Sequence, residues 1–509
     1  YDYDFDSESD RFGNSITIGA DYSINKTLQM NLEGVYKNYY KDKSNNQLYF
    51  QEGETNPFDT PQPETSLEGE DKDNYYGELY LELKKIYDNP DKEILFSITS
   101  DFGKDSEYET IITDTTYIDE SENELEIDFN YKLPINEKSK LEVGYDGKFD
   151  NSKENMQFAL SSDSESWGLS GINNFKYNRA IHGFFAEYEY KINEKISIKP
   201  SLRIEFNSKD IDFAKHSVVT TGTPQSIYAE LLEDTPDSVF NINEINYFPN
   251  FHLTYNLTDK KNFQFSISKR IERPEGTHGW GQLRPFPRNV YNDSFIFIGN
   301  PFLKPEFSTQ YEIKYQSPAP MGFYSVNVYY RNVSDPIEWY DYDGLEDEYT
   351  GNAVTFKNAE SANDFGLEFF TVIMGQVLGG GYNINELHDS SNDYQLNGKN
   401  ERMNLYMKIT LPEEYIKIFS YEFGFYYMKI KVPGGTLFGS KGTLWANTGI
   451  SKSLFDDRAS ISFSINNLFD KGGFQMERTQ PLYGGGEEIT EILASRGGRT
   501  YSLSIKYHF

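Results

Sequence analysis

The sequence predicts an all-β fold, a transmembrane antiparallel β-barrel. Two observations carry the prediction: apolar and polar residues alternate in extended segments, and very short turns alternate with long loops. Residues 499–509 show the first pattern. Successive side chains of a strand point to opposite sides, so one face of this segment is apolar and aromatic while the other is polar. Such a segment fits between lipid and a wet lumen, and we expect it to be the last barrel strand.

The composition agrees with this fold class. The chain has 509 residues, including 40 Tyr and 38 Phe, yet its mean hydropathy is -0.67. No run of about 18 apolar residues occurs, which excludes transmembrane helices. Aromatic residues suit the outer band and interfacial girdles of a barrel, and polar residues suit its lumen and loops. The absence of Cys excludes disulfides, cysteine nucleophiles and cysteine-ligated metals.

The strand pattern recurs along the chain. In residues 124–132, apolar and aromatic side chains alternate with Glu126, Asp128, Asn130 and Lys132. A Lys or Arg facing lipid near the midplane would cost about 2 to 4 kcal/mol, so the polar face must line a lumen. The same division is found in residues 27–37, 141–149, 184–192, 195–207, 263–267 and 459–465.

Turns and loops divide these strands into hairpins. Clusters of Asn, Gly, Pro and Asp predict short turns at residues 24–26, 88–91, 134–138, 193–194, 258–260, 317–320, 374–375, 412–414 and 455–457. Long polar loops are predicted at residues 41–73, 151–175, 207–245, 273–304 and 472–496. Loops of this length argue against a compact soluble domain. In an outer-membrane barrel the short turns are periplasmic and the long loops extracellular. Residues 1–509 are therefore predicted to form one domain.

The strand count predicts a sheet with a free edge. The pattern gives about nineteen strands. Single-chain barrels have an even number of strands, and large transporters have 22. If residues 499–509 descend to the periplasm, the first segment, residues 14–22, also descends. We therefore expect about three earlier strands and an N-terminal plug to be missing from this sequence, and residues 499–509 to lack their closing partner.

The charge balance restricts the partners. The formal net charge is -32, which makes nucleic acid an improbable ligand because phosphate contacts need a basic surface. The acidic residues are expected to form solvated loops. The alternative is that some of them bind Ca²⁺, for which Asp341, Asp343 and Asp347 are the candidate ligands, although they lack the spacing of a calcium-binding loop.

Three motifs resemble a known family. The first follows a strand that ends in Arg270-Ile271-Glu272-Arg273-Pro274 and consists of Gly299, Asn300, Pro301, Leu303, Lys304, Pro305 and Glu306. The second consists of Asn467, Leu468, Phe469 and Asp470, and the third is the C-terminus with Tyr507 and Phe509. Together they resemble TonB-dependent outer-membrane receptors, most closely the subgroup termed outer membrane protein beta-barrel. Taken physically, the prolines of the first motif fix φ, and turn chemistry alone would assign it a loop-shaping role.

The resemblance implies a function and a location. It places the chain in the outer membrane of a Gram-negative cell, in contact with lipids, with Tyr507 and Phe509 as a signal for the barrel-insertion machinery. It implies uptake of a bulky nutrient such as a siderophore, oligosaccharide or peptide, driven by the TonB complex if a plug is present. Partners could include a surface lipoprotein or other envelope subunits. The alternative is a non-transporting barrel that serves as a structural or docking subunit.

No catalytic constellation emerges, so we predict that the chain is not an enzyme. None of the six His lies beside a plausible nucleophile or at metal-ligand spacing. The segment 277–291, here called the aromatic loop, is the preferred ligand or partner contact because aromatic residues and Arg are enriched in recognition surfaces. Its candidate residues are His278, Trp280, Arg284, Phe286, Arg288 and Tyr291. Ordinary loop packing is the alternative.

Overall fold

The structure is a computed structural model of the whole chain. It describes residues 2–50, 64–111, 114–161, 168–213, 219–221, 238–274, 282–283, 287–291, 295–341, 352–391, 396–416, 418–431, 439–440, 442–455, 458–470, 473–481, 487–495 and 498–507.

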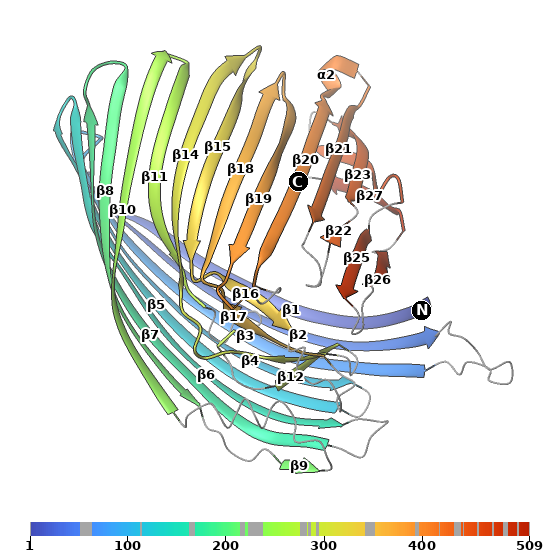
Figure 1. Cartoon of the computed structure of the whole chain (residues 1–509). Coiled ribbons are helices and arrows are strands. Elements are labelled where there is room, and N and C mark those ends of the chain that lie inside the picture. The colour runs from blue at the N-terminus through green and yellow to red at the C-terminus, as the bar shows by residue number, and fades with distance from the viewer. Residues whose placement is uncertain are drawn as a thin grey trace.

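A single large antiparallel sheet dominates the fold and curls around a central space (Figure 1). Its strands are β1 (Asp2–Asn25), β2 (Leu28–Phe50), β3 (Glu64–Ile86), β4 (Glu93–Ile111), β5 (Asp114–Asn136), β6 (Ser139–Ser161), β7 (Gly168–Lys191), β8 (Ile196–Phe213), β9 (Val219–Thr221), β10 (Ser238–Thr258), β11 (Lys261–Glu272), β14 (Glu306–Ala319), β15 (Gly322–Ser334), β18 (Ser361–Ile373), β19 (Gln376–His388), β20 (Gly398–Leu411), β21 (Ser420–Lys431), β23 (Thr443–Leu454), β24 (Ala459–Asn466) and β27 (Thr500–Tyr507). The three-residue β9 only extends the pairing of β7, so nineteen of these twenty strands form the barrel wall among the described residues. This confirms the predicted fold class and strand number.

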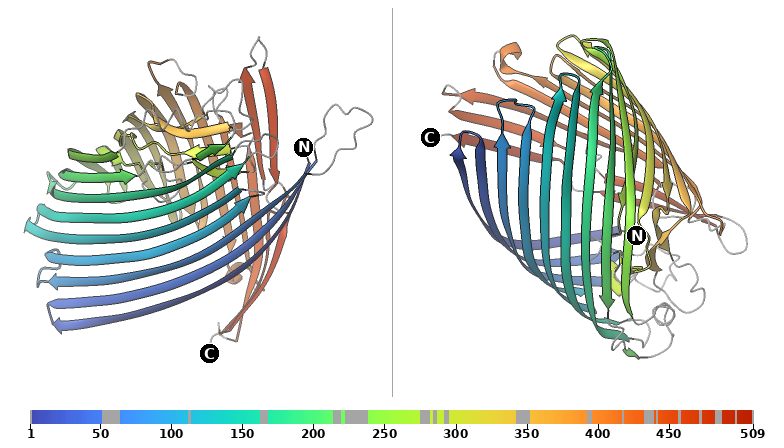
Figure 2. Two further views of the ribbon diagram at one scale, coloured as in Figure 1. Left: turned by 90° about the horizontal axis from the view of Figure 1, so that it is seen from below. Right: turned by 90° about the vertical axis from the view of Figure 1, so that its left-hand side faces the viewer.

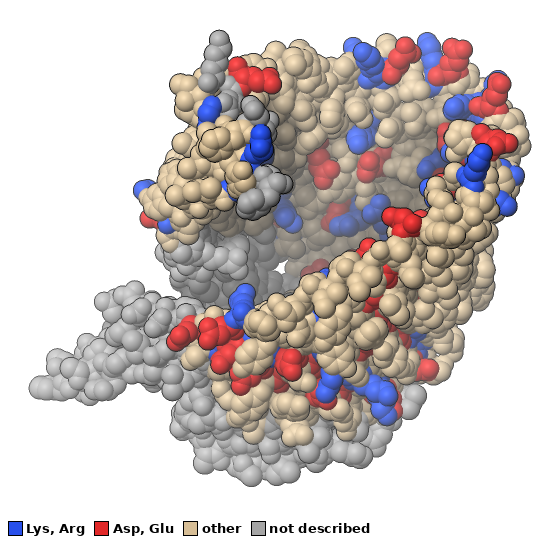
Figure 3. All heavy atoms as spheres, turned by 180° about the vertical axis from the view of Figure 1, so that it is seen from behind, with Lys and Arg blue, Asp and Glu red and all other residues tan. Residues whose placement is uncertain are grey.

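The alternation read from the sequence determines which face of the sheet meets lipid. Ile313 of β14 is 56% exposed and lies opposite Phe265 and Val328 on the neighbouring strands. Residues directly opposite one another in an antiparallel ladder share a face. The outer face is therefore a continuous apolar and aromatic band, while Lys, Arg, Asp and Glu are seen inside the hollow and along its rim (Figure 3).

The short turns are held by the residue types that predicted them. The Oδ1 atom of Asn193 accepts hydrogen bonds from the backbone N–H groups of Lys195 and Ile196 at 2.8 and 2.9 Å. Met374 and Gly375 adopt the left-handed φ values of 51° and 77° that the tight turn between β18 and β19 requires. The longer turn after β20 contains the helix α2 (Glu413–Ile416). In the described part of the chain, no helix has the length and apolar character needed to cross a membrane.

The predicted long loops are wrong in extent. Strands β2 and β3 continue through much of residues 41–73, and β6, β7, β8 and β10 likewise extend into predicted loops. In this outer part both faces of the sheet are wet. On the face that carries the exposed Tyr36 and Tyr40, for example, Asp42 lies opposite Asp10 and Asp71. Without lipid on one side there is no apolar alternation, so the sequence carries no strand signal there.

Two smaller sheets are also present, and four of their strands fall in the segments 273–304 and 472–496 that were predicted to be loops. One contains β12 (Pro287–Tyr291), β13 (Phe295–Ile298), β17 (Asn352–Asn358) and β16 (Ile337–Asp341), and is called the inner sheet below. The other contains β22 (Gly439–Ser440), β25 (Gly473–Pro481) and β26 (Glu487–Ser495). In Figure 1, α2 lies at the end of the barrel that carries the short turns, and β16 and β17 lie near the other end.

The large sheet has two edges. Within the described residues, β1 is laddered to β2 and β27 to β24, and no ladder joins β1 to β27. Figure 2 shows these blue and red edges as the two ends of the curled sheet. The unpaired edge expected for residues 499–509 is therefore observed along β27, the part of this segment that the structure describes as a strand. That three strands and a plug precede Tyr1 stays a prediction.

Candidate ligand-binding surface in the barrel lumen

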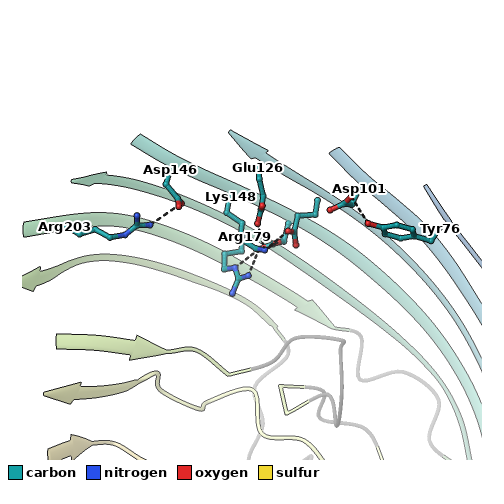
Figure 4. A network of polar contacts seen from close by, with 9 residues as sticks. Tyr76, Asp101, Glu126, Asp146, Lys148, Arg179 and Arg203 are labelled. Carbon is teal, nitrogen blue, oxygen red and sulfur yellow. Dashed lines mark hydrogen bonds and ion pairs between the residues drawn. The ribbon is translucent and has the colours of Figure 1, made fainter. Parts of the chain in front are cut away.

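The register of β5 to β8 brings charged side chains onto the lumen face. Glu126 lies opposite Lys148, and Asp150 lies opposite Arg179. The opposite face of these strands carries the exposed apolar residues, such as Phe129 and Phe184. The charged side chains therefore point into the barrel, where Figure 4 shows them as a band across the curved wall.

These side chains are paired with one another. Lys148 Nζ lies 2.5 Å from Glu124 and 3.0 Å from Glu126, and Arg179 lies 2.6 Å from Asp150. Partial exclusion from bulk water strengthens such charge-assisted hydrogen bonds. The wall of β5 to β7 is therefore largely self-neutralised.

The same pairing continues along β8. Arg203 donates to Asp146 at 3.2 Å and to Glu205 at 2.6 Å, and Glu205 also accepts from Arg273 at 2.5 Å. Tyr76, farther along the band, donates to Asp101 at 2.9 Å. A wall of fixed, alternating charges and hydroxyls is wet and suits a polar solute better than an apolar one.

A polar cavity of about 560 Å³ lies against β8, β10, β11 and β14. Ser266 and Ser268 are opposite Glu312 and Gln310 in the ladder, and these small residues leave room beside longer side chains. The polar residues lining this cavity include Arg203, Asn250, His252, Gln264, Arg270, Gln310, Glu312 and Lys314. Its amide, hydroxyl and charged groups offer both donors and acceptors, which is the chemistry that recognises polar ligands.

A second cavity of about 300 Å³ lies where the inner sheet meets the wall. Asp364 of β18 is only 1% exposed and accepts hydrogen bonds from Arg331 and from Asn385. Glu306, at the start of β14, accepts one from the backbone N–H of Ile337. Glu338 of β16 also lines this cavity, and burial, together with the charges of Glu306 and Asp364, raises its pKa to about 7.

We expect the attachment of the inner sheet to weaken as pH rises, because of Glu338. An unfolded Glu loses its proton near pH 4.5, whereas Glu338 keeps its proton up to about pH 7 in the folded protein. The folded state therefore binds more protons in this window, and stability falls with rising pH. In the parent, the free energy of opening the inner sheet should fall by roughly 1 to 3 kcal/mol over this pH range, and Glu338→Gln should abolish that fall. The opening free energy is measured by hydrogen exchange of the β16 and β17 amides at several pH values between 5 and 8, after correction for the intrinsic exchange rates.

The matched control is Glu312→Gln, which changes another lumen-facing carboxyl outside the second cavity. This variant should keep the pH dependence of β16 and β17. An unchanged pH dependence in Glu338→Gln would contradict the assignment to this carboxyl.

The aromatic loop predicted from the sequence falls largely outside the described residues. His278, Trp280, Arg284 and Phe286 lie outside them, and of Arg288 and Tyr291 only the backbone in β12 is described. The calcium candidates Asp343 and Asp347 also lie outside, and Asp341 is described only as the last backbone position of β16. The described residues contain no group of three or more His, Asp or Glu that could hold a metal ion. Both sites stay predictions.

The first family motif lies at the junction of β14 and the inner sheet. Asn300 donates from its side chain to the carbonyl of Phe356 at 3.0 Å, and the backbone N–H of Lys304 donates to Oδ1 of Asn358 at 2.9 Å. Leu303 is buried, with 3% of its surface exposed. The motif therefore attaches the segment that precedes β14 to strand β17. This agrees with the loop-shaping role expected for Gly299, Pro301, Pro305 and Glu306.

The second motif forms the turn that ends β24. Asn467 and Asp470 have φ values of 54° and 56°, a region that Asn and Asp tolerate better than most residues. The backbone N–H of Leu468 donates to the carbonyl of Ala446 at 2.7 Å, which ties the turn containing Phe469 to β23. Tyr507 is the last residue of β27, and Phe509 lies outside the described residues.

Sequence reasoning missed the paired charges and both cavities. The alternation shows that Glu205 faces a lumen, but its partner Arg273 is 68 positions away. Only the register of β8, β10 and β11, which Arg273 directly follows, brings these two residues together. The pattern of charged residues on the polar face was the available signal, and it does not specify partners.

Comparisons with known proteins give one family and several structural relatives. The profile of a family described as "Outer membrane protein beta-barrel family" matches residues 72–507. No curated protein sequence matches.

Solved structures with the same fold include the ferric citrate transporter FecA, with a TM-score of 0.59 and 11% identity over 99% of this chain and 77% of that one. The copper transporter OprC has a TM-score of 0.57 and 11% identity over 99% of this chain and 80% of that one. The siderophore receptor PirA from Pseudomonas aeruginosa has a TM-score of 0.52 and 12% identity over 97% of this chain and 76% of that one. At these identities the likeness is one of fold.

Proposed function

Because the chain belongs to the outer membrane protein beta-barrel family, we propose that it forms the barrel of a TonB-dependent receptor that imports a bulky nutrient. The family places the protein in the outer membrane of a Gram-negative cell, with its strands crossing the bilayer repeatedly. The proposed receptor function goes further and concerns what passes through the barrel.

The main support is the polar lumen wall. The nineteen described wall strands curl around a space far wider than side chains alone fill in small barrels, and the wall carries a polar cavity of about 560 Å³. The proteins FecA, OprC and PirA, which share the fold, are named as a transporter of ferric citrate, a transporter of copper and a siderophore receptor. Siderophores, oligosaccharides and peptides are the nutrient classes that we propose for this chain.

Deletion of TonB in the native host should abolish uptake through this protein. The reason is that a plugged barrel needs energy from the inner membrane before a solute can pass. Depletion of nutrients from the medium is compared in the parent strain, a strain lacking this gene and a strain lacking TonB. We expect the two deletions to leave the same solute unused. If the gene-dependent solute is still consumed without TonB, the proposal is overturned.

The alternative function is a docking subunit, and the length of the strands favours it. Strands β1 to β3 and β5 to β7 have 23 or 24 residues, whereas about nine to eleven residues cross a membrane. They therefore extend well beyond the bilayer as a paired wall that could hold a surface lipoprotein or another envelope subunit. Stable co-purification with such a subunit, combined with no gene-dependent solute uptake, would favour this function over import.

A further inference from the structure

Lys209 occupies an unusual position on the lumen face of β8. It lies opposite Arg179 of β7 and opposite Ile242 of β10. It is the fourteenth residue of β8, which starts at Ile196, so it lies beyond the part of the strand that crosses the membrane. Only 7% of its surface is exposed. A lysine this deeply buried is normally paired with a carboxylate.

Its two cationic neighbours are already paired, whereas Lys209 forms no ion pair with any residue that the structure describes. Arg179 is bound to Asp150 at 2.6 Å and Arg273 to Glu205 at 2.5 Å. Among the described residues, no carboxylate lies within ion-pair distance of Lys209. Burial lowers the pKa of Lys209; Glu244 opposes this effect, and the charges of Arg179 and Arg273 add to it. An unpaired ammonium at such a site costs free energy unless an anion approaches it.

A second orphan donor belongs to the same group of cations. The Nε–H of Arg273 is buried and has no hydrogen-bond partner among the described residues. Its other nitrogen holds Glu205, so the guanidinium is fixed while one donor remains available. Two unsatisfied cationic donors on the lumen side of a chain with a net charge of -32 are not explained by the packing of the wall.

We propose that Lys209, flanked by Arg179 and Arg273, binds a carboxylate or phosphate group of a soluble ligand that enters the lumen from outside. This inference rests on the proposed function for its biological meaning, since the ligand would be the imported solute. The ammonium supplies charge, and the fixed guanidinium groups supply direction. The ligand therefore bears at least one group that is anionic at neutral pH.

Binding is tested on the full chain folded in detergent, with citrate as the carboxylate probe and pyrophosphate as the phosphate probe. Isothermal titration should show binding of at least one probe. Lys209→Gln should weaken it at least tenfold, whereas Lys209→Arg should keep it within about threefold. Lys176→Gln is the matched control. It removes the same charge from neighbouring β7, where Lys176 pairs with Asp212 at 3.7 Å, and it should bind as the parent does.

Folding of each variant is checked by the gel shift that an unheated barrel shows relative to a heated one. The inference is overturned if the parent binds neither probe, or if Lys209→Gln binds as tightly as the parent. It is also overturned if Lys176→Gln weakens binding as much as Lys209→Gln, because general charge would then explain the effect. A chain that binds a probe while uptake continues without TonB would overturn the proposed function and leave this site standing.

Discussion

Replacing Ile313 by Arg is expected to lower the free energy of unfolding of the barrel in a lipid bilayer by about 2 to 4 kcal/mol. Ile313 lies in the middle of β14 and faces outward, opposite Phe265 and Val328, with 56% of its surface exposed. In the bilayer this exposed surface meets acyl chains. An arginine there must either leave water or bend its side chain toward the headgroups.

Glu312→Arg provides a control that differs by one position in the strand. Glu312 lies opposite Ser266 and lines the polar cavity, so its side chain faces the lumen. An arginine there stays in water and should change stability by less than about 1 kcal/mol. Denaturant-induced unfolding from phospholipid vesicles measures both variants. Equal destabilisation by the two substitutions would contradict the assignment of the two faces.

The comparison of these two neighbours explains why the fold could be predicted from the sequence. A bilayer on one side of the sheet forces every second residue to be apolar, and residues 195–207 or 459–465 show this directly. The constraint ends where the bilayer ends. The outer halves of β2 and β3 pair residue by residue, for example Lys43 with Glu70, but nothing in their sequences distinguishes them from solvated loops.

The candidate site could be predicted only in part, for a related reason. Polar faces at residues 124–132 predicted a wet lumen, and the structure confirms that Glu126 belongs to it. The partner of each charge depends on register across several strands. Arg331 and Asp364 are 33 positions apart, and the sequence has many acidic residues at comparable distances. That Lys209 has no ion-pair partner in the described part of the chain is recognisable only after every neighbouring pair has been placed.

The family motif around Asn300 is different, because its sequence pattern was recognisable while its physical role was not. The structure supplies that role through Asn358, the last residue of β17. Its side-chain amide donates to the carbonyl of Lys304 at 3.0 Å and to that of Asp335 at 2.8 Å. Its Oδ1 accepts from the backbone of Lys304 at 2.9 Å. One side chain therefore ties the inner sheet to the chain segments on both sides of the β14–β15 hairpin.

Asn358→Ala should consequently release the inner sheet while leaving the barrel wall intact. Three hydrogen bonds are lost, each worth roughly 0.5 to 1.5 kcal/mol, so we expect the opening free energy of β16 and β17 to fall by about 2 to 3 kcal/mol. Hydrogen exchange should therefore speed up by about 30-fold to 140-fold in these two strands. The amides of β14 and β15 near the short turn should keep their protection.

Asn332→Ala is the matched control, because it removes an amide whose hydrogen bond, to Asn363 at 3.0 Å, lies on the barrel wall. Exchange in β16 and β17 should then stay as in the parent. If Asn358→Ala also leaves these strands protected, the motif does not anchor the inner sheet through this residue. If both variants loosen the whole barrel, the inner sheet and the wall form one cooperative unit. The separate opening of the inner sheet over the second cavity, on which the effect of Glu338 depends, would then be excluded.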